Sequence, residues 1–220
     1  MIYYVNQSAP REGDGSQARP FRRISDAAYL AQPGDEVLVY PGIYRENVSP
    51  RNGGTEDKRI VYRSVEPLGA VITGAEEITG WQRYEGNVWT VRVDNGIFGS
   101  FNPYVEEVYG DWYFAPTVRH TGCVYMNDRA LYEALTMEEL LAGEVYKPSW
   151  EPEYSIYKWF SVQEGNETVL YANFQDKDPN QEKIEINVRR RCFFPEETGR
   201  GYITFSGFKV EKAATTWAPP

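Results

Sequence analysis

The sequence reads Asp35-Glu36-Val37-Leu38-Val39-Tyr40 and runs directly into Pro41-Gly42. A short apolar run that stops at a Pro-Gly turn predicts a brief β-strand, because a helix needs a longer periodic run. Upstream, the apolar residues of 21–31 recur at helical spacing and end before Pro33-Gly34. The stretch therefore predicts one short helix followed at once by a strand.

Further short strands are expected on both sides of a long middle segment. They fall at 2–5, 60–62 and 71–73 before it, and at 184–188 and 202–210 after it. Very short strands separated by loops of unequal length are typical of a solenoid. We therefore predict an all-β fold, a right-handed parallel β-helix whose open N-terminal end is capped by the helix of 21–31.

The middle segment has a different pattern, with apolar residues alternating on both sides of turn residues. One expected hairpin turns at Gly86-Asn87, and a second turns at Glu164-Gly165-Asn166. Such hairpins predict an antiparallel β-sandwich. We predict three parts: the first part of a parallel β-helix with its capping helix at 1–76, an inserted β-sandwich at 77–183, and a resumed β-helix that ends early at 184–220.

One helix inside the middle segment is specified by its ends. Thr136 is the predicted N-cap, and Glu139 completes a capping box three residues later. Leu135 and Leu140 occupy the positions of a hydrophobic staple, and Gly143 is placed to end the helix.

Composition excludes several classes of partner. The formal net charge is −9, which argues against nucleic acid and anionic membranes, because both bind cationic surfaces. No long apolar run that could span a bilayer occurs. The aromatic fraction is 15%, with 17 Tyr and 6 Trp, and such flat side chains suit sugar rings.

The N-terminus and the cysteines bear on location and on metals. The first residues lack the basic and apolar regions of a signal peptide, so we predict a cytoplasmic protein. Cys123 and Cys192 are then expected to be reduced. The sequence holds one histidine and no paired-ligand spacing, so no metal site and no cofactor is expected.

The residues also resemble a known family. The opening, from Gly15 through Pro33-Gly34-Asp35 to Pro41-Gly42, looks like the N-terminus of many carbohydrate-active β-helix proteins. Three stretches are more specific: 86–89, 98–104 running into Gly110-Asp111-Trp112, and 171–174. These, together with 184–220, resemble glycoside hydrolase family 120 over the whole chain.

This resemblance implies a function. The family contains β-xylosidases that cleave short xylo-oligosaccharides in xylan degradation. It implies a β-helix core, an inserted sandwich, and a retaining mechanism with one nucleophilic carboxylate and one acid/base carboxylate. The resemblance puts both carboxylates on later rungs, beyond residue 220, so no residue of this chain is assigned a catalytic role.

Five residues are the candidates for substrate binding. Trp112 is the first, because the resemblance implies that the matching tryptophan projects towards the cleft; the alternative is a tryptophan of the sandwich core. Asp111 would accept bonds from sugar hydroxyls or cap a turn. Trp217 would line the same cleft or pack under a loop, and Tyr104 would contact substrate or belong to a structural turn. His120, the lone histidine, would join the site or be a satisfied structural residue.

Three functions stay open from the sequence. The first is a portion of a glycosidase whose partner is an oligosaccharide, the second a carbohydrate-binding or interaction module without catalysis, and the third a β-helix polysaccharide lyase. The acidic charge and the insertion argue against the lyase. We expect no turnover from the 220-residue chain alone, and self-association into a homo-oligomer through its open edge or through the sandwich.

Overall fold

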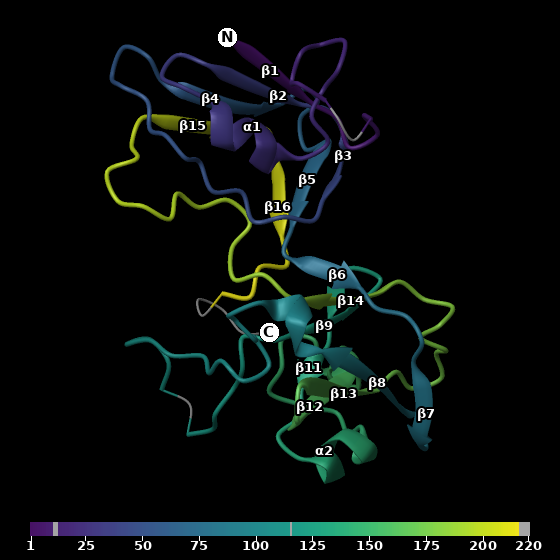
Figure 1. Ribbon diagram of the computed structural model, residues 1–220. Coiled ribbons are helices and arrows are strands. Elements are labelled where there is room, and N and C mark those ends of the chain that lie inside the picture. The colour runs from purple at the N-terminus through teal and green to yellow at the C-terminus, as the bar shows by residue number, and fades with distance from the viewer. Residues whose placement is uncertain (11–12, 115, 216–220) are drawn as a thin grey trace. The chain divides into compact units, whose positions relative to one another are not determined.

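The chain folds into two compact units. The computed structural model describes residues 1–10, 13–114 and 116–215. Unit 1 consists of Met1–Gly74 and Arg191–Ala213, and unit 2 consists of Ala75–Arg190 with residues 214–215 (Figure 1). Each unit has a core of its own, so each is described by itself.

Unit 1 contains one helix and two parallel sheets. The first sheet has the order β1-β2-β4-β15, and the second has the order β16-β5-β3. Every strand pair in both sheets is parallel. The elements are β1 (Ile2–Val5), α1 (Ile24–Leu30), β2 (Glu36–Val39), β3 (Gly42–Tyr44), β4 (Ile60–Ser64), β5 (Ala70–Thr73), β15 (Ile203–Ser206) and β16 (Lys209–Glu211).

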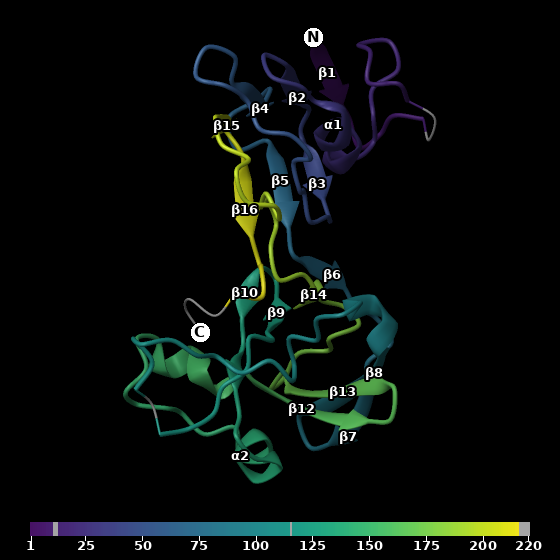
Figure 2. The same ribbon diagram turned by 60° about the vertical axis from the view of Figure 1, so that its left-hand side comes forward.

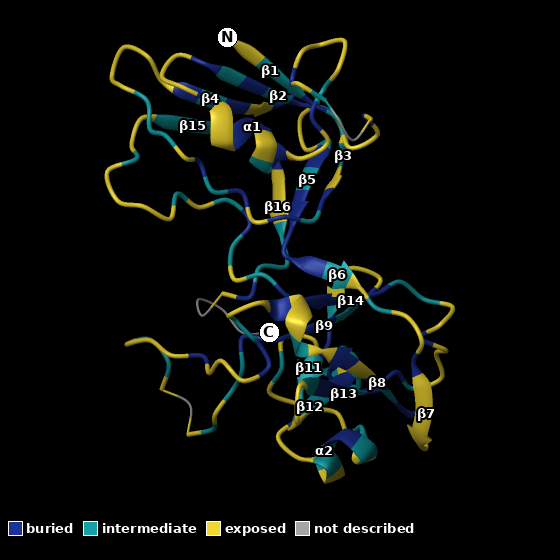
Figure 3. Cartoon of the chain, in the orientation of Figure 1, coloured by how far each residue is buried: buried dark blue, intermediate teal, exposed yellow. Residues whose placement is uncertain are grey.

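The core of unit 1 follows from alternation along its strands. Val37 and Val39 of β2 are fully buried, as are Ile60 and Tyr62 of β4, while their neighbours are more exposed. Helix α1 contributes its apolar face to the same core (Figure 3). The helix is shorter than predicted at its start, because Phe21 forms a parallel bridge with Val5 and so extends the first sheet.

The predicted parallel β-helix is wrong. The described residues form four small sheets, and parallel pairing dominates only in the two sheets of unit 1. A β-helix needs a third continuous parallel sheet, but on that side unit 1 has the isolated bridge between Val48 and Phe193. The segments around this bridge contain Pro50 and Pro195, which lack the amide hydrogen that a ladder requires. Sequence periodicity identified strands correctly but not how far they would pair.

Unit 2 holds the two other sheets (Figure 2). One sheet has the order β10-β9-β14-β6, and the other has the order β11-β12-β13-β8-β7. The strands are β6 (Ala75–Glu77), β7 (Gln82–Glu85), β8 (Val88–Asp94), β9 (Val124–Met126), β10 (Arg129–Ala130), β11 (Tyr132–Glu133), β12 (Lys158–Glu164), β13 (Glu167–Asn173) and β14 (Ile184–Asn187). The helices are η1 (Asn95–Phe98), α2 (Met137–Ala142) and η2 (Pro152–Ile156).

Both sheets of unit 2 contribute to a single hydrophobic cluster. Val91 and Trp159 enter it from the five-stranded sheet, and Val124 and Ile186 enter it from the four-stranded sheet. Both predicted hairpins are confirmed: β7 pairs with β8, and β12 pairs with β13, each antiparallel. The larger sheet is not purely antiparallel, because β11 pairs with β12 in parallel.

Helix α2 confirms the prediction from its ends. The Thr136 hydroxyl accepts the amide hydrogen of Glu139 at 3.2 Å, and Gly143 ends the helix with a positive φ of 54°. The Glu139 carboxylate accepts the amide hydrogen of Leu135 at 2.9 Å, one residue before the expected partner. Within the described part of the chain, the helices are short, and none is long and apolar enough to cross a membrane.

Candidate functional site

A projecting hairpin-like segment of unit 2 carries the first candidate residues. Residues 106–121, of which 115 is not described, form this segment, which we call the arm (Figure 1). Its two sides are joined by the bridge between Glu107 and His120 and by a hydrogen bond from the Val108 amide to the Arg119 carbonyl at 2.7 Å. Trp112 lies in the turn near its tip.

A cavity of about 550 Å³ lies beside the arm in unit 2. Its lining includes four aromatic rings: Tyr113 of the arm, Tyr132 of β11, Trp159 of β12, and Tyr146. Its charged lining residues are Arg119, Glu133, Glu139 and Lys158. The lining therefore combines flat apolar faces with hydrogen-bonding groups, the combination found in small-molecule sites.

One cation of this cavity pairs with a carboxylate, and the other binds a backbone carbonyl oxygen. Lys158 is 4% exposed, and its ammonium lies 2.8 Å from the Glu139 carboxylate. Burial alone would raise the pKa of Glu139, but the amide of Leu135 and the ammonium of Lys158 outweigh burial and hold that pKa below its ordinary value. Arg119 donates to the Glu133 carbonyl oxygen at 2.5 Å. Two carboxylates and two cations thus leave the lining close to neutral.

His120 and Glu133 form a hydrogen-bonded pair at the base of the arm. His120 Nδ1 lies 2.6 Å from Glu133 Oε1, and the His120 amide donates to Glu133 Oε2 at 3.0 Å. The hydrogen bond to Glu133 raises the pKa of His120 above its ordinary value of 6.5, although partial burial opposes the shift. A second hollow of about 270 Å³ contacts both side chains.

Tyr104 lies behind the wall of the cavity. It is 2% exposed, its hydroxyl donates to the Cys123 carbonyl at 2.8 Å, and its ring meets the Trp159 ring edge-on at 5.4 Å. Burial raises the pKa of Tyr104 well above its ordinary value. A side chain at Gly122, which lines the cavity, would collide with the Tyr104 ring. Tyr104 therefore supports the wall from the core side.

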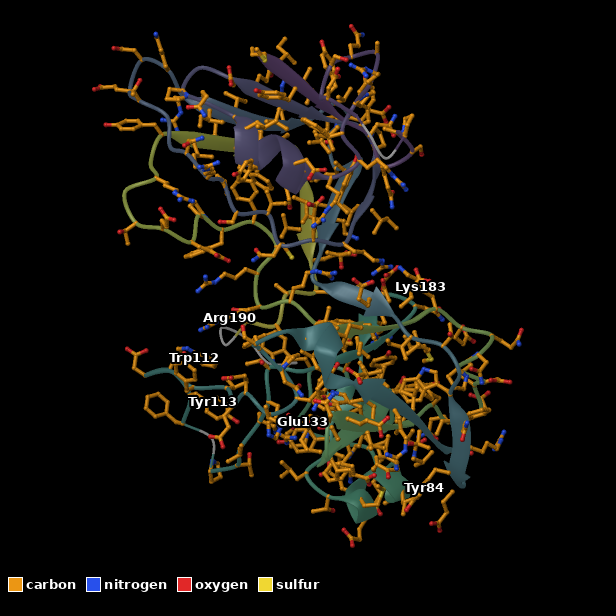
Figure 4. All side chains as sticks on the ribbon, viewed as in Figure 1. Tyr84, Trp112, Tyr113, Glu133, Lys183 and Arg190 are labelled. Carbon is orange, nitrogen blue, oxygen red and sulfur yellow. The ribbon has the colours of Figure 1, made fainter. Side chains whose placement is uncertain are left out.

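The structure brings some of the predicted residues together. Trp112 is half-buried and packs edge-on against Tyr113 at 5.7 Å, and Asp111 is exposed beside it on the arm (Figure 4). His120 stands at the base of the same arm, and Tyr104 lies in the core. Trp217 lies outside the described residues.

None of the predicted substrate-binding residues that the structure describes is among the lining residues of the cavity, and the residues that sequence reasoning missed include Tyr113, Glu133, Lys158 and, in this role, Glu139. Glu139 was noticed only as a capping residue. Lys158 stands directly before Trp159-Phe160 at the head of a strand, where a buried lysine is unusual, and this was the available signal. No local pattern marks Glu133, whose partner His120 is 13 residues away.

The arrangement fits binding of a neutral polar ligand better than bond cleavage. Aromatic faces can pack on the C–H face of a pyranose, and the paired charges can exchange hydrogen bonds with hydroxyl groups. Both lining carboxylates already have partners, since Glu133 binds His120 and Glu139 binds Lys158, and Glu139 lacks the raised pKa of a general acid. No group of side chains in the described residues is arranged to hold a metal ion.

Comparisons with known proteins agree with a carbohydrate-related role. Residues 78–186 match the family described as glycoside hydrolase 120, insertion domain. The complex of XylC with xylose is similar to the whole chain, with 42% identity and a TM-score of 0.91, and the chain covers 36% of that protein. A second structure, described as a glycoside hydrolase, shares 11% identity over 96% of this chain and 50% of that one, with a TM-score of 0.54, and so shows the fold alone. No curated protein matches the chain.

Proposed function

Since this chain belongs to glycoside hydrolase family 120 through its insertion domain at residues 78–186, we propose that it is the sugar-binding portion of a β-xylosidase for short xylo-oligosaccharides. The observation that carries the proposal is the likeness to XylC, which extends over the entire chain at 42% identity. The XylC structure is a complex with xylose. The chain covers 36% of XylC, so the activity of a whole enzyme is part of the proposal.

The proposed division of labour assigns binding to this chain. Trp112 and Tyr113 supply flat faces for a xylose ring, and Asp111 accepts hydrogen bonds from its hydroxyls. Arg119 and Lys158, already oriented by Glu133 and Glu139, present N–H groups to the cavity lining. Near neutrality of the lining favours an uncharged pentose over a uronate, because a bound uronate would give the site a net negative charge.

The chemical step is proposed to use two carboxylates that lie outside residues 1–220. A retaining glycosidase needs one carboxylate as nucleophile and another as acid/base, and the acid requires a raised pKa. What supports this assignment is the state of the cavity carboxylates: Glu133 is bound to His120, and Glu139 is bound to Lys158. Neither is available to attack an anomeric carbon or to protonate a leaving group.

Titration of xylobiose into the purified chain by calorimetry tests the proposal. Tyr113→Ala should weaken binding about fivefold, because an aromatic contact is worth about 1 kcal/mol. Tyr84→Ala is the matched control, since Tyr84 is a half-exposed tyrosine of β7 in the same unit and is not among the lining residues. Equal affinities for the wild type and both variants would contradict the proposal.

A non-catalytic carbohydrate-binding module is the second candidate, and the ion-paired state of Glu133 and Glu139 favours it. An assay with a chromogenic xyloside separates the two candidates. The complete polypeptide should release xylose if it is a glycosidase and should release none if it is a binding module. The chain 1–220 alone is expected to release none under either account. Release that is lost in Glu133→Gln or Glu139→Gln would contradict both.

We also propose that the protein is cytoplasmic and that it forms a homo-oligomer. Cys123 and Cys192 are both buried thiols, which agrees with a reducing compartment such as the cytoplasm. Self-association into a homo-oligomer is checked by light scattering at high protein concentration.

A further inference from the structure

Glu133 joins the arm to the sheet of unit 2 by several contacts at once. Both carboxylate oxygens bind one residue, with Oε2 accepting the His120 amide at 3.0 Å and Oε1 lying 2.6 Å from His120 Nδ1. Its carbonyl oxygen accepts Arg119 Nη1 at 2.5 Å. Three groups of two consecutive arm residues therefore converge on one residue of β11.

The sheet end of this connection is firmly held. Glu133 pairs with Trp159 in the parallel ladder between β11 and β12, and Trp159 is 1% exposed. The next residue, Ala134, donates its amide hydrogen to the Trp159 carbonyl at 2.7 Å. The Glu133 side chain itself is only 11% exposed. A nearly buried carboxylate on a packed strand is a fixed point rather than a mobile surface group.

The arm, by contrast, is stabilised largely by bonds within itself. The Val108 amide binds the Arg119 carbonyl, and the Tyr113 hydroxyl binds the Thr117 carbonyl at 2.8 Å. Such bonds keep the arm's shape but do not fix its direction relative to the sheet. Phe114 is 88% exposed, so the tip contributes little burial.

We propose that Glu133 is the positioning residue of the sugar site, which anchors the arm through His120 and Arg119 and so keeps Tyr113 in the lining of the cavity. This inference rests on the proposed function for its ligand, but the anchoring itself can be measured without a sugar. Glu133 touches no reacting atom in this account and acts only through the arm.

The ionic state of His120 gives the anchor a pH dependence. The groups that face His120 are Glu133, Glu107 and Arg119; the first two favour its protonated form, and Arg119 opposes it. Because the pKa of His120 is raised, the charged pair is complete below pH 6.5 and weakens as the pH rises through the raised value. Sugar affinity should fall over the same interval, because an arm that is in place for a smaller fraction of the time binds correspondingly more weakly.

Hydrogen exchange of the segment 106–121 is the direct test, measured in the wild type, Glu133→Gln and Glu133→Ala. A charge-assisted bond to a nearly buried group is worth at least about 1.4 kcal/mol, so exchange should be about tenfold faster in both variants. Glu85→Gln is the matched control: it removes the same charge from an exposed residue of β7 in the same unit. Exchange in Glu133→Gln at the wild-type rate would overturn the proposal.

Xylobiose affinity as a function of pH supplies the functional readout. The wild type should bind more weakly as the pH rises above 6.5, whereas Glu133→Gln and His120→Asn should bind weakly at every pH. A wild-type pH profile retained in Glu133→Gln would also overturn the positioning role. If the wild type binds no xylobiose while arm exchange still depends on Glu133, the anchor is supported and the proposed function fails.

Discussion

At the scale of single residues, Glu46 shows how a distant side chain completes a helix. Arg23 at the N-cap of α1 makes no capping bond through its side chain. The 4% exposed carboxylate of Glu46 accepts the amide hydrogens of Ile24 and Ser25 at 2.8 and 2.9 Å instead. Since free amides at a helix start need acceptors, this one side chain ties α1 to the segment that follows β3.

Glu46→Gln should therefore destabilise the protein by about 1–3 kcal/mol. The substitution removes the negative charge and replaces one of the two accepting oxygens with an amide group, so one backbone amide loses its acceptor. Urea denaturation followed by circular dichroism measures the change. Glu66→Gln is the control at an exposed position of unit 1, and it should change stability by less than about 0.5 kcal/mol. Equal stabilities of the two variants would show that the cap is energetically unimportant.

His120 should give the protein a pH-dependent stability near neutrality. Its pKa is raised in the folded state by the hydrogen bond to Glu133, so the stabilisation is fully present below pH 6.5 and is lost as the pH rises through the raised value. It is the only histidine in the sequence. The melting temperature of the wild type should fall over this interval, and that of His120→Asn should not. A parallel fall in the variant would exclude His120 as the cause.

The candidate site was only partly predictable at this scale. Trp112 and Asp111 were predicted from the Gly110-Asp111-Trp112 stretch and stay predictions; both lie on the arm, which reaches the cavity lining through Tyr113. Glu133 could not be found, because its partner is 13 residues away and no periodic pattern joins them. Its position depends on β11 pairing with β12, which is a tertiary contact.

At the scale of elements, local signals were reliable. Helix α2 forms between Thr136 and Gly143 as its capping residues predict, and both hairpins of unit 2 turn at the expected glycines. The helix and both hairpins are specified by residues close together in sequence, so the local sequence pattern is enough to predict them. Glu139 departs from the simple box because its carboxylate also pairs with Lys158.

Thr136→Ala should destabilise α2, and with it unit 2, by about 1 kcal/mol through loss of the N-cap. Thr136→Ser keeps the hydroxyl that accepts the Glu139 amide and should stay within about 0.5 kcal/mol of the wild type. Chemical denaturation of both variants makes the comparison. A loss of equal size in the serine variant would assign the effect to packing of the threonine methyl group.

At the scale of the whole molecule, strand identity was predictable but strand pairing was not. Short strands were expected at 35–40, 60–62 and 71–73 and are observed there as β2, β4 and β5, whereas β3 forms directly at Gly42, where a turn was expected. The parallel β-helix inferred from them is wrong, because pairing between strands far apart in sequence depends on loops whose length and proline content break the third sheet. A pattern of regularly spaced short strands in a sequence therefore predicts the strands themselves but not their assembly into a solenoid.

We expect the cavity of unit 2 beside the arm to bind a xylose unit. The most direct measurement is a crystal structure of the protein grown with xylobiose. We predict a pyranose ring against Tyr113 and Trp112, with hydroxyls near Arg119 and Lys158. A sugar bound elsewhere, or a cavity that holds only solvent at saturating xylobiose, would contradict the account.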